Sequence, residues 1–173
     1  MKHPLRSVLF LLLVSLVVAS VRAGDPPTTA PSDAAKPTLA FDQAADKALL
    51  VMKQRAEELK IHGVAVIAYS AGDEVAAWTS KMMVVGQMTN APAPGKKGDN
   101  LLAIAYAKAA EMAETLKDSG SAGQPPMTGE FGWRGGKIAK TKSGYLIAAF
   151  SGGASDQDVQ VSQAGFDALG TGP

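Results

Sequence analysis

The last third of the chain places a strand pair, a flexible turn and a helix in close succession, and this order constrains the fold more than any other feature. Two short strand-like runs, Lys137–Lys142 and Tyr145–Ser151, are joined at Ser143-Gly144, a dipeptide suited to a tight hairpin turn. The double glycine Gly152-Gly153 then allows a sharp change of direction before a helix over residues 155–169. A hairpin that leads into a closing helix predicts an antiparallel sheet with a helix packed against it.

The closing helix begins with a sequence typical of helix N-termini. Ser155 is predicted to be the N-cap residue, because its hydroxyl can accept a backbone hydrogen bond from the first turn. Asp156 and Asp158 follow and place negative charge at the positive end of the helix dipole. Ser155 and Gly144 are therefore expected to contribute to stability through the cap and the hairpin turn.

Upstream, the hydrophobic pattern predicts a helix, two strands and a second helix. Apolar residues recur at helical spacing from Phe41 to Leu59, and this helix is expected to end near His62-Gly63. Strands are predicted at Gly63–Tyr69, buried on both faces, and at Glu74–Met83, and a second helix at Leu101–Lys117. Helices around one antiparallel sheet of about five strands make a single α+β domain, expected over residues 40–170.

The first 39 residues are expected to lie outside this domain. Residues 1–23 have a positive start, a short apolar run and small residues before the expected cleavage site, which is typical of a signal peptide. Residues 24–39 are rich in proline and nearly free of apolar side chains, which predicts a disordered tether. The protein is therefore expected to be exported, periplasmic or secreted, without membrane insertion after cleavage.

Charge and composition exclude several classes of partner and site. The chain has 17 Lys and Arg against 16 Asp and Glu, and loss of Lys2, Arg6 and Arg22 with the leader reverses the balance to about −2. Nucleic acid needs a basic face, so it is not an expected partner. The chain has no cysteine, which excludes disulfides, thiolate metal sites and a cysteine nucleophile. No catalytic residue can be assigned from the sequence.

A set of short motifs between Phe41 and Leu169 carries a family resemblance. These motifs are Gly135-Gly136, Gly144, Ser151-Gly152-Gly153, Asp156-Gln157-Asp158 leading into Ala164-Gly165, the helix at Ala105–Ala109 and the pair Lys81-Met82. With them the chain resembles the GlcG/HbpS-like haem-binding family, some of whose relatives carry a haem-degrading label. It departs from that family in lacking an aspartate-glycine turn after the first strand and a proline after the double glycine.

The resemblance implies a profilin-like layout and non-covalent binding of haem or a related tetrapyrrole in a homo-oligomer, as a sensor accessory or scavenger. His62 or Met82 is a candidate axial ligand to the haem iron, with Met83 as a further thioether. Lys81, Lys108 and Arg134 are candidate partners of the propionates. Each residue also has an ordinary interpretation: methionines fill gaps in cores, His62 can face solvent at a helix end, and Lys108 can point outward from its helix.

Two other functions remain open from the sequence. One is a cofactor-free structural or interaction domain of the same fold, for which self-association would be the main property. The other is an enzyme acting on a small carboxylate, which is suggested only by relatives named after glycolate-utilisation operons. A Soret band in the purified protein would separate haem binding from both.

Overall fold

The computed structural model describes residues 35–95, 97–121 and 132–170, and these all belong to one compact unit. The expected signal peptide at residues 1–23 and residues 24–34 of the expected tether lie outside the described residues. The α+β class predicted from the sequence is confirmed. In chain order the elements are α1 (Ala35–Glu58), β1 (Gly63–Ala71), β2 (Thr79–Val85), α2 (Leu101–Thr115), β3 (Gly136–Lys140), β4 (Gly144–Ser151) and α3 (Ser155–Leu169).

The described strands form one four-stranded antiparallel sheet in the order β2-β1-β4-β3, close to the expected five. The two central strands, β1 and β4, are almost entirely buried. For β1, the continuous apolar run from Gly63 predicted this burial. Val64 pairs with both Val84 and Ser151, and Ile67 pairs with both Lys81 and Ala148. Paired residues share a face of the sheet, so this register decides which helix each side chain meets.

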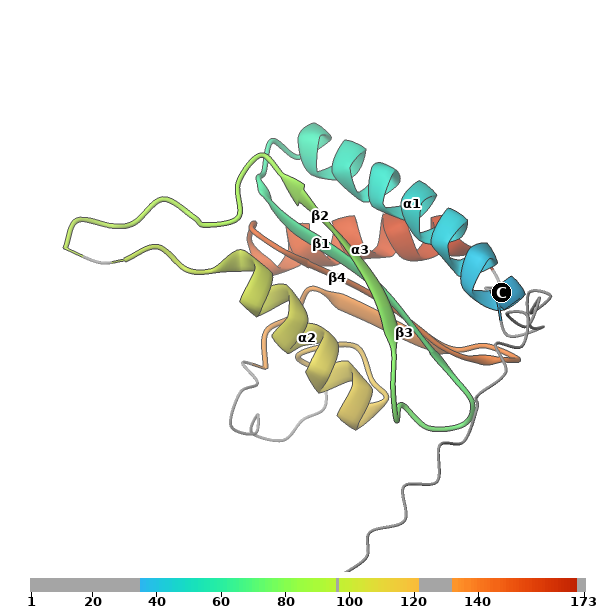
Figure 1. Ribbon diagram of the computed structural model, residues 1–173. Helices are drawn as coiled ribbons and strands as arrows, with labels where there is room; N and C mark the ends of the chain where they lie inside the picture. Colours follow the sequence, from blue (N-terminus) through green and yellow to red (C-terminus); the bar gives the residue numbers. More distant parts are fainter. Residues whose placement is uncertain (1–34, 96, 122–131, 171–173) are drawn as a thin grey trace, which may run out of the picture. The chain divides into compact units, whose positions relative to one another are not determined.

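The sheet is covered on both faces, with α1 and α3 on one side and α2 on the other (Figure 1). Side chains alternate between the two faces along each strand. Ile67 and Phe150 pack with α1 and α3, whereas Val66 and Ile147 pack with α2. The helix α2 contacts β1, β3 and β4. Its start is fixed by Asn100, whose side-chain oxygen accepts a 3.0 Å hydrogen bond from the backbone N–H of Ala103.

Three element boundaries differ from those expected. The helix α1 begins at Ala35, so residues 35–39 are helical where a tether was expected; a proline at position 37 is tolerated because first-turn N–H groups have no intrahelical partner. It ends at Glu58, ahead of the His62-Gly63 stop, and Lys60 adopts the left-handed conformation with φ 56°. The strand β2 begins at Thr79, and residues 74–78 form a connection instead of the first half of a strand.

The predicted N-cap of α3 is wrong. The cap position is Ala154, and Ser155 is the first residue of the helix with its side chain exposed. Gln157 satisfies the cap, since its Oε1 accepts a 3.0 Å hydrogen bond from the backbone N–H of Ala154. Asp158 Oδ1 accepts a 2.8 Å bond from the N–H of Gly153. The turn after the double glycine is therefore fixed by side chains from inside the helix.

Within residues 35–95, 97–121 and 132–170, no helix combines the length and the apolar character that crossing a membrane requires.

Candidate functional site

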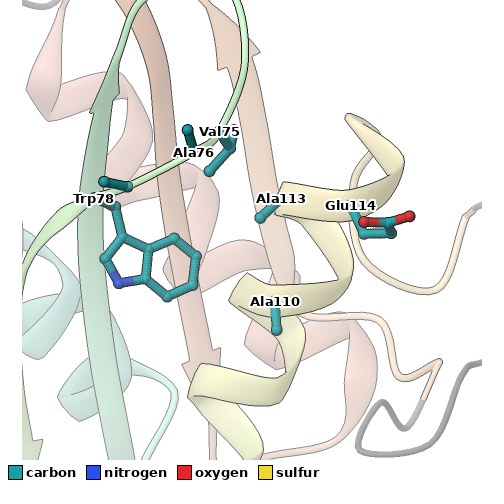
Figure 2. Close-up of a pocket in the computed structure, with 7 residues that line it drawn as sticks. Val75, Ala76, Trp78, Ala110, Ala113 and Glu114 are labelled. Carbon is teal, nitrogen blue, oxygen red and sulfur yellow. The ribbon is translucent and has the colours of Figure 1, made fainter.

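An apolar groove of about 350 Å³ lies between the connection that precedes β2 and the second half of α2. Figure 2 shows the indole ring of Trp78 directed toward α2, with the methyl groups of Ala110 and Ala113 on the helix opposite it. Its volume falls within the range of about 300–1,000 Å³ found for small-molecule sites. The lining residues are Val75, Ala76, Ala77, Trp78, Ala110, Ala113 and Glu114.

Aromatic contacts fix the position of Trp78 in this groove. Its ring centroid lies 6.5 Å from that of Tyr106 on α2, with an interplanar angle of 38°. The hydroxyl of Tyr106 is in turn hydrogen-bonded to the hydroxyl of Ser80 at 3.0 Å. Tyr106 on α2 therefore lies beside the indole, and Ser80 on β2 in turn positions Tyr106. The small side chains of Ala110 and Ala113 leave the space that it faces.

A second cavity, of about 170 Å³, lies on another side of α2, where the helix meets the end of β4 and the start of α3. A volume of this size corresponds to about five or six waters. It shares no lining residue with the Trp78 groove. The lining is largely polar and comprises Asn90, Asp99, Leu101, Ile104, Lys108, Trp133, Arg134, Ser151, Gly152, Gly153, Ser155 and Asp158.

A buried ion pair lies at the inner wall of the second cavity. Lys108 Nζ is 2.8 Å from Asp158 Oδ2, and the two side chains are only 2% and 5% exposed. The same ammonium donates a 2.8 Å hydrogen bond to the backbone carbonyl of Phe150. The pair joins α2 to α3, and the carbonyl bond joins both to β4.

Burial opposes ionisation of both partners. Burial lowers the pKa of the Lys108 ammonium below its usual value, and the attraction of Asp158 works against this shift. Burial likewise raises the pKa of Asp158, against the favourable effects of Lys108 and of the backbone N–H groups of Gly152 and Gly153. For both groups burial is the larger influence on the pKa, and the attraction of the partner offsets only part of it.

The candidate haem residues on β2 lie on opposite faces of the sheet. Lys81 and Met83 face α1: Lys81 Nζ lies 2.8 Å from Asp46 Oδ1 and 3.7 Å from Asp42 Oδ1, and Met83 packs against the α1 and α3 core. The hydrogen bond to Asp46 raises the pKa of Lys81. Met82 instead packs with the α2 core beside Trp78 and Tyr106. Of these three residues, only Met82 is on the side of the Trp78 groove.

The remaining candidates lie elsewhere. His62 is exposed in the connection between α1 and β1, with its ring close to Gly86, where an added Cβ would lie 2.6 Å from the ring. Arg134 is at the rim of the second cavity, where its Nη1 pairs with Asp156 Oδ1 at 2.8 Å. Lys108 does not point outward from α2; its ammonium is buried against Asp158.

The structure brings Lys108 and Arg134 together and separates them from Met82. Lys108 and Ala110 differ by two helical positions, about 200° around α2, so their side chains leave opposite sides of the helix. A ligand in the Trp78 groove cannot reach the Lys108 ammonium. Among the described residues, no group of three or more His, Cys, Asp or Glu side chains is arranged to hold a metal ion.

Sequence reasoning missed the partners that define both cavities. Asp158 was interpreted as a helix-dipole residue, although its main contact is a lysine 50 positions away. Trp78 was expected within a strand, and it ends a connection instead.

No protein-family model matches this sequence, and a search of curated proteins finds no match either.

Proposed function

We propose that the protein binds a flat and largely apolar small molecule in the Trp78 groove, and that haem or a related tetrapyrrole, held non-covalently, is that molecule. The observation that carries this proposal is the apolar groove of about 350 Å³ with an aromatic ring on one side and two alanine methyl groups on the other. Flat aromatic ligands are held by such surfaces through stacking and burial. The resemblance of the sequence to haem-binding proteins selects the tetrapyrrole.

The residues around the groove suit the apolar macrocycle of a haem better than its charged propionates. The apolar lining suits the face of the macrocycle, and the thioether of Met82 packs in the same cluster as Trp78, which makes it the candidate iron ligand on this side of the sheet. The charged lining residue is Glu114, an acid, so the lining offers no cation for the propionates. These groups would therefore remain in water, and binding would be exchangeable.

Titration of the apo protein with haemin tests this proposal. We expect a saturable change in the Soret region at micromolar haemin, which corresponds to about 8 kcal/mol of affinity. Trp78→Ala should weaken binding at least about tenfold, or 1.4 kcal/mol. Trp133→Ala removes the other tryptophan, which lines the second cavity, and serves as the matched control. Equal affinities for the two variants, or no saturable change with the wild type, would exclude the Trp78 groove.

Filling the groove gives an independent test. Ala113→Phe places a ring in the space that Trp78 faces, and it should reduce haemin binding while the protein stays folded. Ala103→Phe adds the same ring at an exposed position on α2 that does not line the groove, so haemin affinity should be unchanged. If both variants lost binding, the effect would reflect α2 in general and would count against a defined groove.

We propose further that the protein is exported and acts outside the cytoplasm. The support is the signal-like sequence of residues 1–23, with Val21-Arg22-Ala23 at the expected cleavage site. Cleavage would leave Gly24 as the first residue. Intact-mass measurement of the protein recovered from the extracytoplasmic fraction checks this, and a mass that retains residues 1–23 would contradict it.

A second candidate function is self-association as an interaction domain. It is favoured by apolar exposure along β2, an edge strand of the described sheet, where Val84 and the following Met88 are 38% and 39% exposed. Unpaired strand edges and exposed apolar side chains are features of association surfaces. Light scattering after size-exclusion chromatography should give a mass above that of one chain, and Val84→Lys should lower it. A monomer at all concentrations would remove this candidate.

A further inference from the structure

A serine hydroxyl on the inner wall of the second cavity is available to a ligand. Ser151 is only 4% exposed, and its Oγ makes no hydrogen bond among the described residues. It is not one of the fully buried side-chain atoms that lack a partner in the described part of the chain, which are Glu111 Oε2 and Ser119 Oγ. Ser151 pairs with Val64, whose side chain packs with α2, so its hydroxyl lies on the α2 side and lines the cavity. The hydroxyl therefore opens onto the cavity, where it can donate a hydrogen bond to a bound molecule.

The neighbouring ammonium also has unused donor capacity. Lys108 Nζ carries three N–H groups, of which two are used by Phe150 O and Asp158 Oδ2. Both oxygens of Asp158 are likewise occupied, one by Lys108 and the other by the N–H of Gly153. The inner wall therefore presents donors with free capacity, whereas its carboxylate already accepts two hydrogen bonds. A ligand that completes this wall must supply an acceptor.

The rim of the cavity adds a planar cation. Arg134 pairs with Asp156, but the two side chains are 57% and 78% exposed, and such surface pairs are readily exchanged for another acceptor. The remaining rim carboxylate, Asp99, accepts a 2.7 Å bond from Asn90 Nδ2. The guanidinium fork matches the two oxygens of a carboxylate better than it matches a single acceptor.

We propose that this cavity binds a small carboxylate, with Ser151 and Lys108 donating to it from the inner wall and Arg134 from the rim. The cavity holds only about 170 Å³, which suits a molecule of a few heavy atoms and excludes a tetrapyrrole. The site is independent of the proposed haem groove, because the two cavities share no lining residue and lie on opposite sides of α2. Failure of one proposal therefore leaves the other untouched.

Titration of the full mature chain with acetate, followed by backbone amide NMR, tests the proposal. The amide signals of Gly152 and Gly153, which line the cavity, should shift saturably at about millimolar acetate. Acetamide has the same shape without the charge and should bind at least tenfold more weakly. Equal shifts with acetamide, or shifts that do not saturate, would overturn the assignment of an anion site.

Two serine variants test the inner wall. Ser151→Ala removes the wall hydroxyl and should weaken acetate binding about ten- to hundredfold, as expected for a hydrogen bond to a charged group. Ser121→Ala removes an exposed hydroxyl that lines neither cavity, and it should leave the affinity within about twofold. Unchanged binding by Ser151→Ala would contradict the proposal. The Ser151 hydroxyl makes no hydrogen bond within the described protein, so Ser151→Ala should not lower the melting temperature. An unchanged melting temperature would separate a loss of acetate binding from unfolding.

Titration with inorganic phosphate tests whether the site prefers a planar or a tetrahedral anion. If the guanidinium fork and the small volume select a planar carboxylate, phosphate should bind more weakly than acetate and should not displace it at equal concentration. Tighter binding of phosphate would overturn the carboxylate assignment in favour of a tetrahedral anion. Arg134→Gln keeps a polar rim but removes the charge, and it should lower acetate affinity severalfold while leaving haemin binding unchanged.

Discussion

At the scale of single residues, the structure depends on a charge pair that hydrophobic patterning does not predict. Lys108 and Asp158 bury opposite charges between α2 and α3, and burial shifts both pKa values away from the charged forms. Such pairs contribute little net stability when intact, but removing one partner leaves an uncompensated buried charge. The pair is thus better understood as a constraint on how α2 and α3 meet than as a source of stability.

Lys108→Met should therefore reduce the free energy of unfolding by about 3–5 kcal/mol. The effect has a pH dependence: without the lysine, the pKa of Asp158 rises further above its unfolded value. The native variant then binds more protons than the unfolded chain above the ordinary aspartate pKa of 3.8, so its stability falls as pH rises through that window. Urea unfolding at pH 5 and pH 7.5 measures both effects.

Lys81→Met is the matched control for this prediction. Lys81 pairs with Asp42 and Asp46 at the surface, where solvent screens the charges. Its loss should change stability far less than the loss of Lys108, with little difference between the two pH values. Equal destabilisation by both substitutions would show that the Lys108 pair is not special.

The start of α3 gives a second prediction at the residue scale. Gln157→Ala removes the acceptor for the N–H of Ala154 and should destabilise the protein by about 1 kcal/mol. Ser155→Ala should stay within about 0.5 kcal/mol, because Ser155 is exposed and is not the cap. Thermal unfolding of the two variants checks the ranking, and the reverse order would restore Ser155 as the capping residue.

At the scale of elements, Gly144 is required for strand packing as well as for the turn. It is the first residue of β4 and pairs with Ala71 at the end of β1. An added Cβ would overlap the carbonyl oxygen of Ser70 and lie 2.9 Å from the Cα of Ala71. The requirement is thus a close approach of two strands, which sequence reasoning about the hairpin turn alone did not identify.

Gly144→Ala should destabilise the protein by about 2–3 kcal/mol, because the obstructing atoms are backbone and cannot move aside cheaply. Gly72→Ala is a suitable comparison. Gly72 has φ 92°, but an added Cβ there meets no atom within 4 Å, so its cost reflects backbone conformation alone, about 1–2 kcal/mol. Urea unfolding should rank Gly144→Ala as the more costly; an equal or smaller effect would mean that β1 and β4 can separate locally.

The element boundaries show what local sequence does and does not encode. The strands β1 and β4 and the helix α2 were predicted close to their observed positions, because continuous apolar runs and helical periodicity are local signals. The start of β2 was not. The run from Val75 to Trp78 is apolar enough for a strand, but it lies outside β2 and lines the groove beside α2. Local apolar patterning alone does not distinguish these two outcomes.

At the scale of the whole molecule, the sheet separates candidate haem-binding residues that are neighbours in the sequence. Adjacent residues on a strand point to opposite faces, so Met82 and Met83 belong to different cores. Lys108 and Arg134 belong to a third region on the far side of α2 from the Trp78 groove. The types of residue that a haem site needs were visible in the sequence, but their distribution over two faces depends on the strand register.

This separation yields a final prediction for the haemin complex. If the groove beside Trp78 binds haemin and Met82 supplies the sulfur ligand, Met82→Ala should move the Soret maximum and weaken binding. Met83→Ala should destabilise the core on the α1 and α3 side but leave the spectrum of the complex unchanged. His62→Ala should leave both unchanged, because His62 is exposed and its ring lies beside Gly86. A band shift caused by His62→Ala and not by Met82→Ala would place the iron at the end of the sheet and would exclude the groove as the haem site.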